Sequence, residues 1–319
     1  MINIKTKNLI GVSIVIIATL IWLYVIQGYA TGYGFSRVSL VSEIKKDYGR
    51  DGGEWSFGWV VLPAILTLIF LTRKRYQELE LKPDHIIGGL LLLIGFFVYF
   101  AGFKANQKYF GYASGQIIAV GAIFWFLGRQ WFFMSFWLVV LLGMMWPWRF
   151  LIEPISFPLQ LIMVKLTTGF LNLIGDPAIS NGTAIMSTKV DPVDGGAINL
   201  NVAAACSGLR SLFALFMMGL IYGYLSLKKE WKRVLLISLV PLIAIIGNFV
   251  RMMMLYFGTQ VMGRKVAIGE GEHDPSSYHI TSGLAVFVVA IIVMMICVEL
   301  MNRGFRMLKK RKTVVKNVA

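Results

Sequence analysis

Residues 280–298 read ITSGLAVFVVAIIVMMICV, a stretch without a charged side chain. As an α-helix this stretch is about 28 Å long, close to the roughly 30 Å of hydrocarbon in a bilayer. Similar stretches recur along the chain of 319 residues, in which 57% of residues are hydrophobic and 15% are charged. This composition excludes an ordinary soluble domain and predicts an integral membrane protein.

Hydropathy and segment length predict eight transmembrane helices, at about residues 9–27, 55–72, 86–103, 110–128, 131–148, 203–227, 234–257 and 281–302. The apolar segment 151–175 is interrupted by Pro154, Pro158 and Lys165, so we expect an interfacial or re-entrant helix there. The polar residues 176–201 contain turn signals and predict an extracytoplasmic loop with a small strand-like flap. The expected fold is an all-α, polytopic membrane helical bundle of about eight transmembrane helices plus one interfacial or re-entrant helix.

The net charge of +15 follows from the distribution of lysine and arginine. Many of these residues fall in 73–82, 228–233 and 303–316, which the predicted spans place on one side of the membrane. The positive-inside rule assigns that side to the cytoplasm, together with both termini. We therefore expect a multi-pass protein of the cytoplasmic (inner) membrane whose first span is a retained signal anchor. The basic charge is explained by loops on the cytoplasmic side of the lipid bilayer, so no nucleic-acid partner is expected.

The sixth predicted span opens with Ala-Ala-Ala-Cys-Ser-Gly-Leu-Arg at 203–210. Arg210 follows Cys206 at i+4 on the same helix face, and a nearby cation favours the reactive thiolate. Ser207 lies between them in the sequence. A membrane cysteine is more often a small packing residue, and we expect that role for Cys297, deep in the last span. Two cysteines exclude a disulfide framework and a thiolate metal site, so no metal or cofactor is predicted.

The seventh predicted span contains Asn248 and Arg251 near its outer end. An arginine inside a membrane is expensive, so it either serves function or extends its side chain to the lipid headgroups. Asn248 shares its helix face, where it would orient the guanidinium or make an ordinary hydrogen bond between helices.

The eighth predicted span begins with His279, and Gly283 follows one turn later. His273 precedes it in the same outer loop and is the alternative histidine. Asp274 is positioned to orient either ring. His85, the third histidine of the chain, falls on the cytoplasmic side and is predicted to be a bystander.

Three consecutive predicted spans therefore each bring one reactive side chain to the same membrane face. A thiol at Cys206, a guanidinium at Arg251 and an imidazole at His279 are the nucleophile, oxyanion donor and acid that acyl transfer requires. Two other classes remain open from the residues alone. One is a transporter or channel in which Arg210, Arg251 and His279 line an ion pathway. The other is a membrane scaffold or assembly partner for polysaccharide export.

The motifs Ala-Cys-Ser-Gly-Leu-Arg at 205–210, Asn-x-x-Arg at 248–251 and His-x-x-x-Gly at 279–283, in this order, resemble the exosortase/archaeosortase family, in its bacterial exosortase branch. The resemblance covers mainly residues 150–300. It places the family's cysteine on Cys206, its arginine on Arg251 and its third residue on His279. The polar segment that precedes His279, residues 270–278, is longer than this pattern leads us to expect and contains a second histidine. His273 therefore remains an alternative to His279.

The resemblance implies a cysteine transpeptidase or protease of exported proteins that carry a C-terminal sorting signal, made of a short motif, a transmembrane helix and a basic tail. Attack by Cys206 would give an acyl-enzyme, which an amine acceptor or water then resolves at the extracytoplasmic face. The signal helix would dock beside the sixth to eighth spans. Within one integral membrane domain, we expect N-terminal helices in 1–150, an exosortase-like catalytic core in 151–302 and a basic cytoplasmic tail in 303–319.

Overall fold

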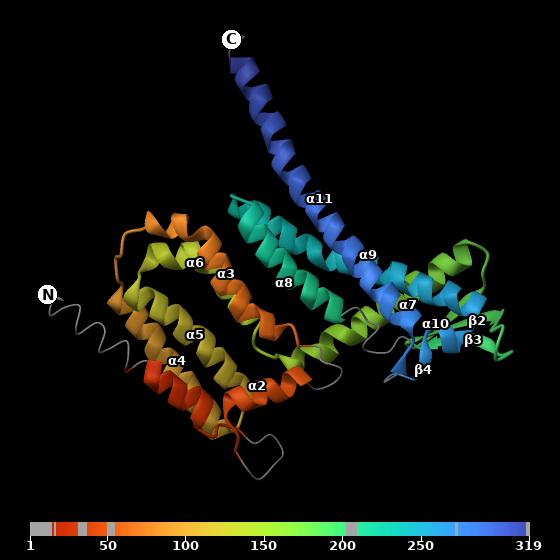
Figure 1. Ribbon diagram of the computed structural model, residues 1–319, viewed down its shortest axis with the longest axis horizontal. Helices are drawn as coiled ribbons and strands as arrows, with labels where there is room; N and C mark the ends of the chain where they lie inside the picture. Colours follow the sequence, from red (N-terminus) through yellow and green to blue (C-terminus); the bar gives the residue numbers. More distant parts are fainter. Residues whose placement is uncertain are drawn as a thin grey trace. The chain divides into compact units, whose positions relative to one another are not determined.

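The computed structural model describes residue 15 and residues 17–30, 37–49, 55–201, 209–271 and 274–316. The chain divides into two compact units, Met1–Trp148 and Arg149–Ala319, each with packing of its own (Figure 1). The described residues are mostly helical, as expected, but the second unit also contains two small antiparallel sheets.

Among its described residues the first unit contains the short π-helix η1 (Trp22–Ile26) and the α-helices α2 (Leu40–Gly49), α3 (Gly58–Gln77), α4 (His85–Ala105), α5 (Lys108–Phe126) and α6 (Arg129–Gly143). Helix α4 begins where the Asp84 side chain accepts the Ile87 N–H at 3.0 Å, and it ends at Asn106 with a φ of 55°. A Cβ on Gly121 would lie 3.0 Å from the backbone nitrogen of Leu92. Glycine at this position therefore lets α4 and α5 pack closely.

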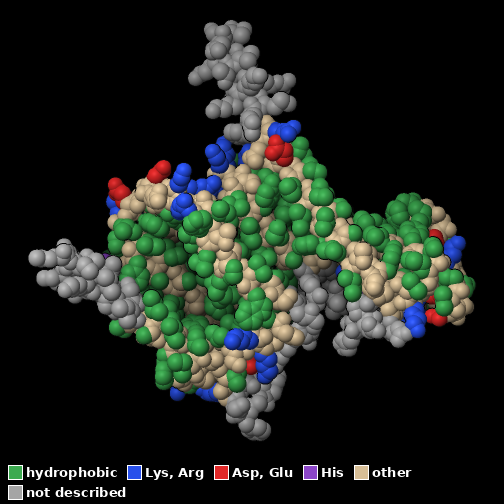
Figure 2. All heavy atoms as spheres, in the orientation of Figure 1, with side chains coloured by type: hydrophobic (Ala, Val, Ile, Leu, Met, Phe, Trp, Pro, Cys, Tyr) green, Lys and Arg blue, Asp and Glu red, His purple; other side chains and the backbone are tan. Residues whose placement is uncertain are grey.

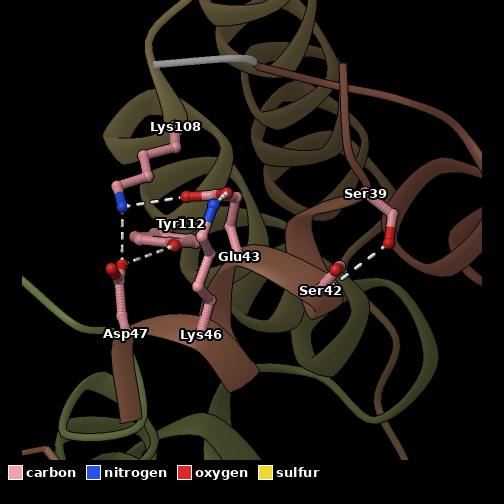
Figure 3. A network of polar contacts seen from close by, with 7 residues as sticks. All are labelled: Ser39, Ser42, Glu43, Lys46, Asp47, Lys108 and Tyr112. Atoms are coloured by element: carbon pink, nitrogen blue, oxygen red, sulfur yellow. Dashed lines mark hydrogen bonds and ion pairs between the residues drawn. The ribbon is translucent and has the colours of Figure 1, made fainter. Parts of the chain in front are cut away.

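A buried charge network joins α2 to the start of α5 (Figure 3). Lys108 Nζ lies 3.1 Å from Glu43 Oε2 and 2.7 Å from Asp47 Oδ2, and Tyr112 donates to the same Asp47 oxygen at 3.4 Å. The Asp47 side chain is fully buried. Because buried carboxylates are costly without a partner, Lys108 holds α2 in place.

The second unit opens with a 3-10 turn and a helix, η2 (Arg149–Leu151) and α7 (Ile152–Leu173), followed by strands β1 (Ala178–Asn181), β2 (Ala184–Val190) and β3 (Ala197–Asn201). It continues with α8 (Leu209–Ser226), α9 (Glu230–Met262), α10 (Arg264–Ala267), β4 (Gly269–Gly271), β5 (Asp274–Pro275) and α11 (Ser277–Lys316). The first three strands form one antiparallel sheet in chain order, and β4 pairs with β5.

The three-stranded sheet is packed on α7 and α9. Its buried residues Ile185 and Leu200 share a core with Leu171 of α7 and with Met252 and Tyr256 of α9. The strand-like element expected in residues 176–201 is therefore present, and it has a hydrophobic underside.

Five described helices are long and apolar enough to cross a bilayer, by length and composition: His85–Ala105, Lys108–Phe126, Pro154–Leu173, Glu230–Met262 and Ser277–Arg303. Shorter apolar helices lie at Ile17–Ile26, Arg129–Gly143 and Ser211–Ser226. Hydrophobic side chains cover much of the visible surface, and charged ones lie at its margins (Figure 2). The chain is a polytopic helical membrane protein, and the total of eight spans stays a prediction.

Two segments differ from the expected pattern. Helix α7, expected to be interfacial or re-entrant, is continuous and long enough to cross. Pro158 removes only the hydrogen bond to the carbonyl of Pro154, and burial of Val164 and Leu171 holds the helix together. Helix α3, of 20 residues, covers most of the predicted span at 55–72, but the basic residues 73–75 lie within it, so it is not among the five apolar helices.

Candidate active site

The ends of three helices meet at one end of the second unit. Helices α8, α9 and α11 contact one another, and the chain reverses direction between α8 and α9 and again between α9 and α11. The start of α8, the C-terminal half of α9 and the start of α11 therefore lie at the same end (Figure 1). The expected meeting of these three helix ends is present in the fold, whereas the convergence of Cys206 with Arg251 and His279 stays a prediction.

Arg251 lies directly against Gly283. A Cβ added to this glycine would lie 3.2 Å from Arg251 Cζ and 3.3 Å from both Nε and Nη2. Nε of Arg251 is buried and has no hydrogen-bond partner among the described residues. Gly283 is thus the residue that leaves room for the guanidinium between α9 and α11.

A small cleft between α8, α9 and α11 contains this guanidinium. Asn248, buried to 4% exposure, lines the cleft together with Arg251, and Ser211 of α8 faces it from the other side. The space of about 10 Å³ is close to what one water molecule needs. The cleft is therefore too small to hold a peptide in this conformation.

The first turn of α11 is fixed on both sides of His279. The Ser276 hydroxyl caps the helix by accepting the His279 N–H at 3.1 Å, and Ser282 donates to the His279 carbonyl at 2.8 Å. Tyr278 donates to the carbonyl of Met254 at 3.1 Å, which holds this turn against α9. His279 precedes Gly283, against which Arg251 lies, by one helical turn. The two residues therefore lie at the same end of the contact between α9 and α11.

The sheet is tied to the same half of α9 by a polar cluster. Tyr256 donates to Ser187 Oγ at 2.7 Å, and Gln260 donates to Asp176 Oδ2 at 2.6 Å. Tyr256 belongs to the core under the sheet, whereas Arg251 lines the cleft toward α8 and α11. The sheet and the cleft thus occupy different faces of α9.

Asp191 joins the sheet to the connection between α9 and α11. One carboxylate oxygen accepts the backbone N–H groups of Val193 at 2.8 Å and Asp194 at 3.2 Å, and the other accepts that of Arg264 at 2.7 Å. These bonds, first that from Val193, hold the pKa of Asp191 below its usual value. The ionised carboxylate is therefore the form that the fold requires.

The opposite end of the bundle is basic and cross-linked by hydrogen bonds. Lys232 donates to the carbonyl of Met301 at 2.6 Å, Arg233 donates to that of Leu227 at 2.9 Å, and Asn302 contacts the carbonyl of Ser226 at 3.4 Å. These bonds connect α8, α9 and α11 about 30 Å from the first turn of α11, measured along the helix.

The structure brings together Arg251, Asn248, Gly283 and His279 among the residues predicted for the site. Cys206, Ser207 and His273 lie outside the described residues, and the side chains of Arg210 and Asp274 are not described. Cys297 is a free cysteine 18 positions beyond His279 on α11. His85 packs its ring against Trp125 in the first unit, at 4.7 Å.

The sequence did not single out Tyr278, the Ser276 cap or the cluster of Asp176, Ser187, Tyr256 and Gln260. A serine three residues before the histidine is a recognisable helix-start signal. Gln260 and Asp176 are 84 positions apart, so no local pattern connects them. No group of three or more histidine, cysteine, aspartate or glutamate side chains that could hold a metal ion occurs within the described part of the chain.

The fold and this cleft define a polytopic membrane protein with a polar site at the ends of three helices. Residues 50–296 match the family of transmembrane exosortases (Exosortase_EpsH), which covers most of the chain. The chain belongs to this family, whose members are membrane peptidases and transpeptidases that process sorting signals. Comparisons with curated proteins and with solved structures gave no match.

Proposed function

We propose that this exosortase is a cysteine transpeptidase that cleaves a C-terminal sorting signal through an acyl-enzyme on Cys206. In this mechanism the thiolate attacks the scissile carbonyl carbon and forms an S–C bond. Arg251 stabilises the oxyanion, and His279 gives a proton to the nitrogen that leaves when the C–N bond breaks. An amine acceptor, or water, then attacks the thioester, gives a proton to His279 and releases Cys206 as the thiolate when the S–C bond breaks.

The guanidinium of half-buried Arg251, whose Nε is buried, is the observation that carries this proposal. An arginine within a membrane span is kept only where it has a task or a route to water. Arg251 leaves its Nε without a protein partner among the described residues and lies against Gly283, one helical turn after His279. An available donor beside an imidazole is the arrangement that stabilises the charge of a tetrahedral intermediate.

The position of the nucleophile in the sequence agrees with this arrangement. Cys206 is three residues before Leu209, the first residue of α8, and five before Ser211, which lines the cleft. Five residues of fully extended chain span at most about 18 Å. The segment that contains Cys206 also follows directly after β3, whose sheet is packed on α9.

The basic end of the bundle supports an extracytoplasmic site. Lys228 and Lys229 lie between α8 and α9, Lys232 and Arg233 lie in the first turn of α9, and the basic residues 303–316 form the C-terminal part of α11. Loops rich in lysine and arginine remain in the cytoplasm. The cleft at the other end of these helices then faces the outer side of the cytoplasmic membrane.

The test follows an exported reporter that carries a C-terminal signal of a short motif, a transmembrane helix and a basic tail, taken from the same cell. We expect Cys206→Ala and Cys206→Ser to abolish shortening of the reporter, whereas Cys297→Ala is the matched control and leaves it unchanged. Full processing by both Cys206 variants would end the proposal.

A second set of variants assigns the other two roles. Arg251→Lys is expected to lose most activity, because a compact ammonium does not reproduce the guanidinium fork. Separate changes of His279 and His273 to alanine identify the acid as the residue whose loss stops cleavage. Normal turnover by Arg251→Lys would restrict this arginine to a structural role.

A further inference from the structure

A second concave surface lies on the same two helices as the site. This α9–α11 groove has a volume of about 190 Å³ and is lined only by apolar residues: Ile243, Ile246, Gly247, Val250 and Met254 of α9, and Ala285, Val286, Val289, Ala290 and Val293 of α11. From Ile243 to Met254 it follows α9 for about 16 Å, or three helical turns. Val250 and Val289 are 44% and 57% exposed, so the groove is open on its outer side.

The α9–α11 groove and the small cleft that contains Arg251 lie on opposite sides of the contact between α9 and α11. Gly247, Val286 and Ala290 line both of them. Gly247 and Ala290 are small, as is Ala285 at the end of the groove nearest the first turn of α11. Small side chains allow a helix backbone to approach closely. An occupant of the groove therefore lies one helix thickness or less from Asn248 and Arg251.

We infer that the α9–α11 groove binds the transmembrane helix of the sorting-signal substrate, an inference that rests on the proposed function. Both helices lie within spans that cross the membrane by length and composition, so the occupant is a membrane segment. A helix in the groove ends near Met254 and Ala285, the level of the first turns of α11. The chain that precedes it then reaches Gly283, Arg251 and His279 as an extended peptide.

The other large groove of this unit fits the substrate helix less well. It has a volume of about 470 Å³ and lies between α7 and α9, where Lys165 lines it together with Phe170 and Phe249. A lysine beside an apolar helix in the membrane is unfavourable. This groove also shares no lining residue with the cleft that contains Arg251. The α9–α11 groove is the one continuous with the catalytic groups.

Site-specific photo-crosslinking tests the inference in the full-length membrane protein. Benzoylphenylalanine is placed at Val250 or Val289 in the groove, or at Phe170 as the control, in a Cys206→Ala background with the uncut reporter. We expect an adduct with the reporter's transmembrane helix at the two groove positions and at least tenfold less at Phe170. Adducts only with lipid, only with a second copy of the chain, or mainly at Phe170 would overturn the inference.

A pair of substitutions provides an independent measurement. Ala285→Phe fills the groove, whereas Val288→Phe adds the same ring to an exposed position outside it. In vesicles containing the enzyme and the reporter, we expect Ala285→Phe to lower kcat/KM about tenfold, mainly through KM, and Val288→Phe to have little effect. Equal effects of the two changes would count against the groove. Cleavage by Cys206→Ala would instead refute the proposed function, which separates the two failures.

Discussion

A methyl group at Gly283 is the smallest change that tests the geometry of the site. In Gly283→Ala the new Cβ lies 3.2 Å from Arg251 Cζ, whereas carbon atoms in good contact are about 3.5–4.0 Å apart. The guanidinium must therefore move by about 0.3–0.8 Å. Because a misplacement of about 1 Å can cost a hundredfold in rate, we expect kcat to fall about tenfold. Alanine also favours the helix by about 1 kcal/mol, so thermal stability should not decrease.

The assay is the rate of reporter shortening in vesicles, measured beside the thermal unfolding of the purified protein. Gly223→Ala is the matched control, since its Cβ would lie 3.3 Å from Leu236 Cδ2, an equally close contact with an apolar side chain. We expect this control to keep the wild-type rate. A wild-type rate for Gly283→Ala, or an equal loss in both variants, would refute the link between the glycine and the position of Arg251.

Three further predictions concern the sheet and the first unit. Tyr256→Phe removes a 2.7 Å bond to Ser187 and should cost about 1 kcal/mol of unfolding free energy, and in the double variant with Ser187→Ala the two losses should be less than additive, because they share this bond. Folding lowers the pKa of Asp191, so its contribution to stability is complete above the unfolded-state pKa of about 3.9 and is lost as the pH falls through the folded-state pKa. Asp191→Asn should therefore flatten the dependence of the melting temperature on acid pH. Lys108→Met leaves two buried carboxylates without their cation and should cost about 3 kcal/mol in chemical unfolding, whereas Lys46→Met, at an exposed position, should have little effect.

The parts of the site carried by regular helices were predictable from the sequence. Arg251 and Asn248 lie three residues apart on one helix, and His279 and Gly283 lie four apart on another, so helical periodicity alone puts each pair on one face. The alternation of helix direction then brings both pairs to the same end of the bundle. Chain order and hydropathy are sufficient for this inference because the membrane forces the helices to be nearly antiparallel.

The parts fixed by tertiary contacts were not predictable in this way. The sheet was expected as a flap, but its docking on α9 depends on Tyr256 and Ser187, which are 69 positions apart. Helix α7 was expected to be interfacial or re-entrant because two prolines and a lysine lower its hydropathy; it is long and apolar enough to cross a membrane, and its buried face is apparent only in the folded unit. Contacts of this kind have no local sequence signal.

Asp191 has a consequence for any attempt to redesign this enzyme. Its carboxylate closes the turn between β2 and β3, the strand that leads toward Cys206, and it also holds Arg264, at the start of the connection that leads to His279. Asp191 therefore fastens the β2–β3 turn to the start of the connection between α9 and α11. A chimaera that takes one of these loops from a relative should take both. A loop from another protein need not present the backbone N–H that the Asp191 carboxylate accepts.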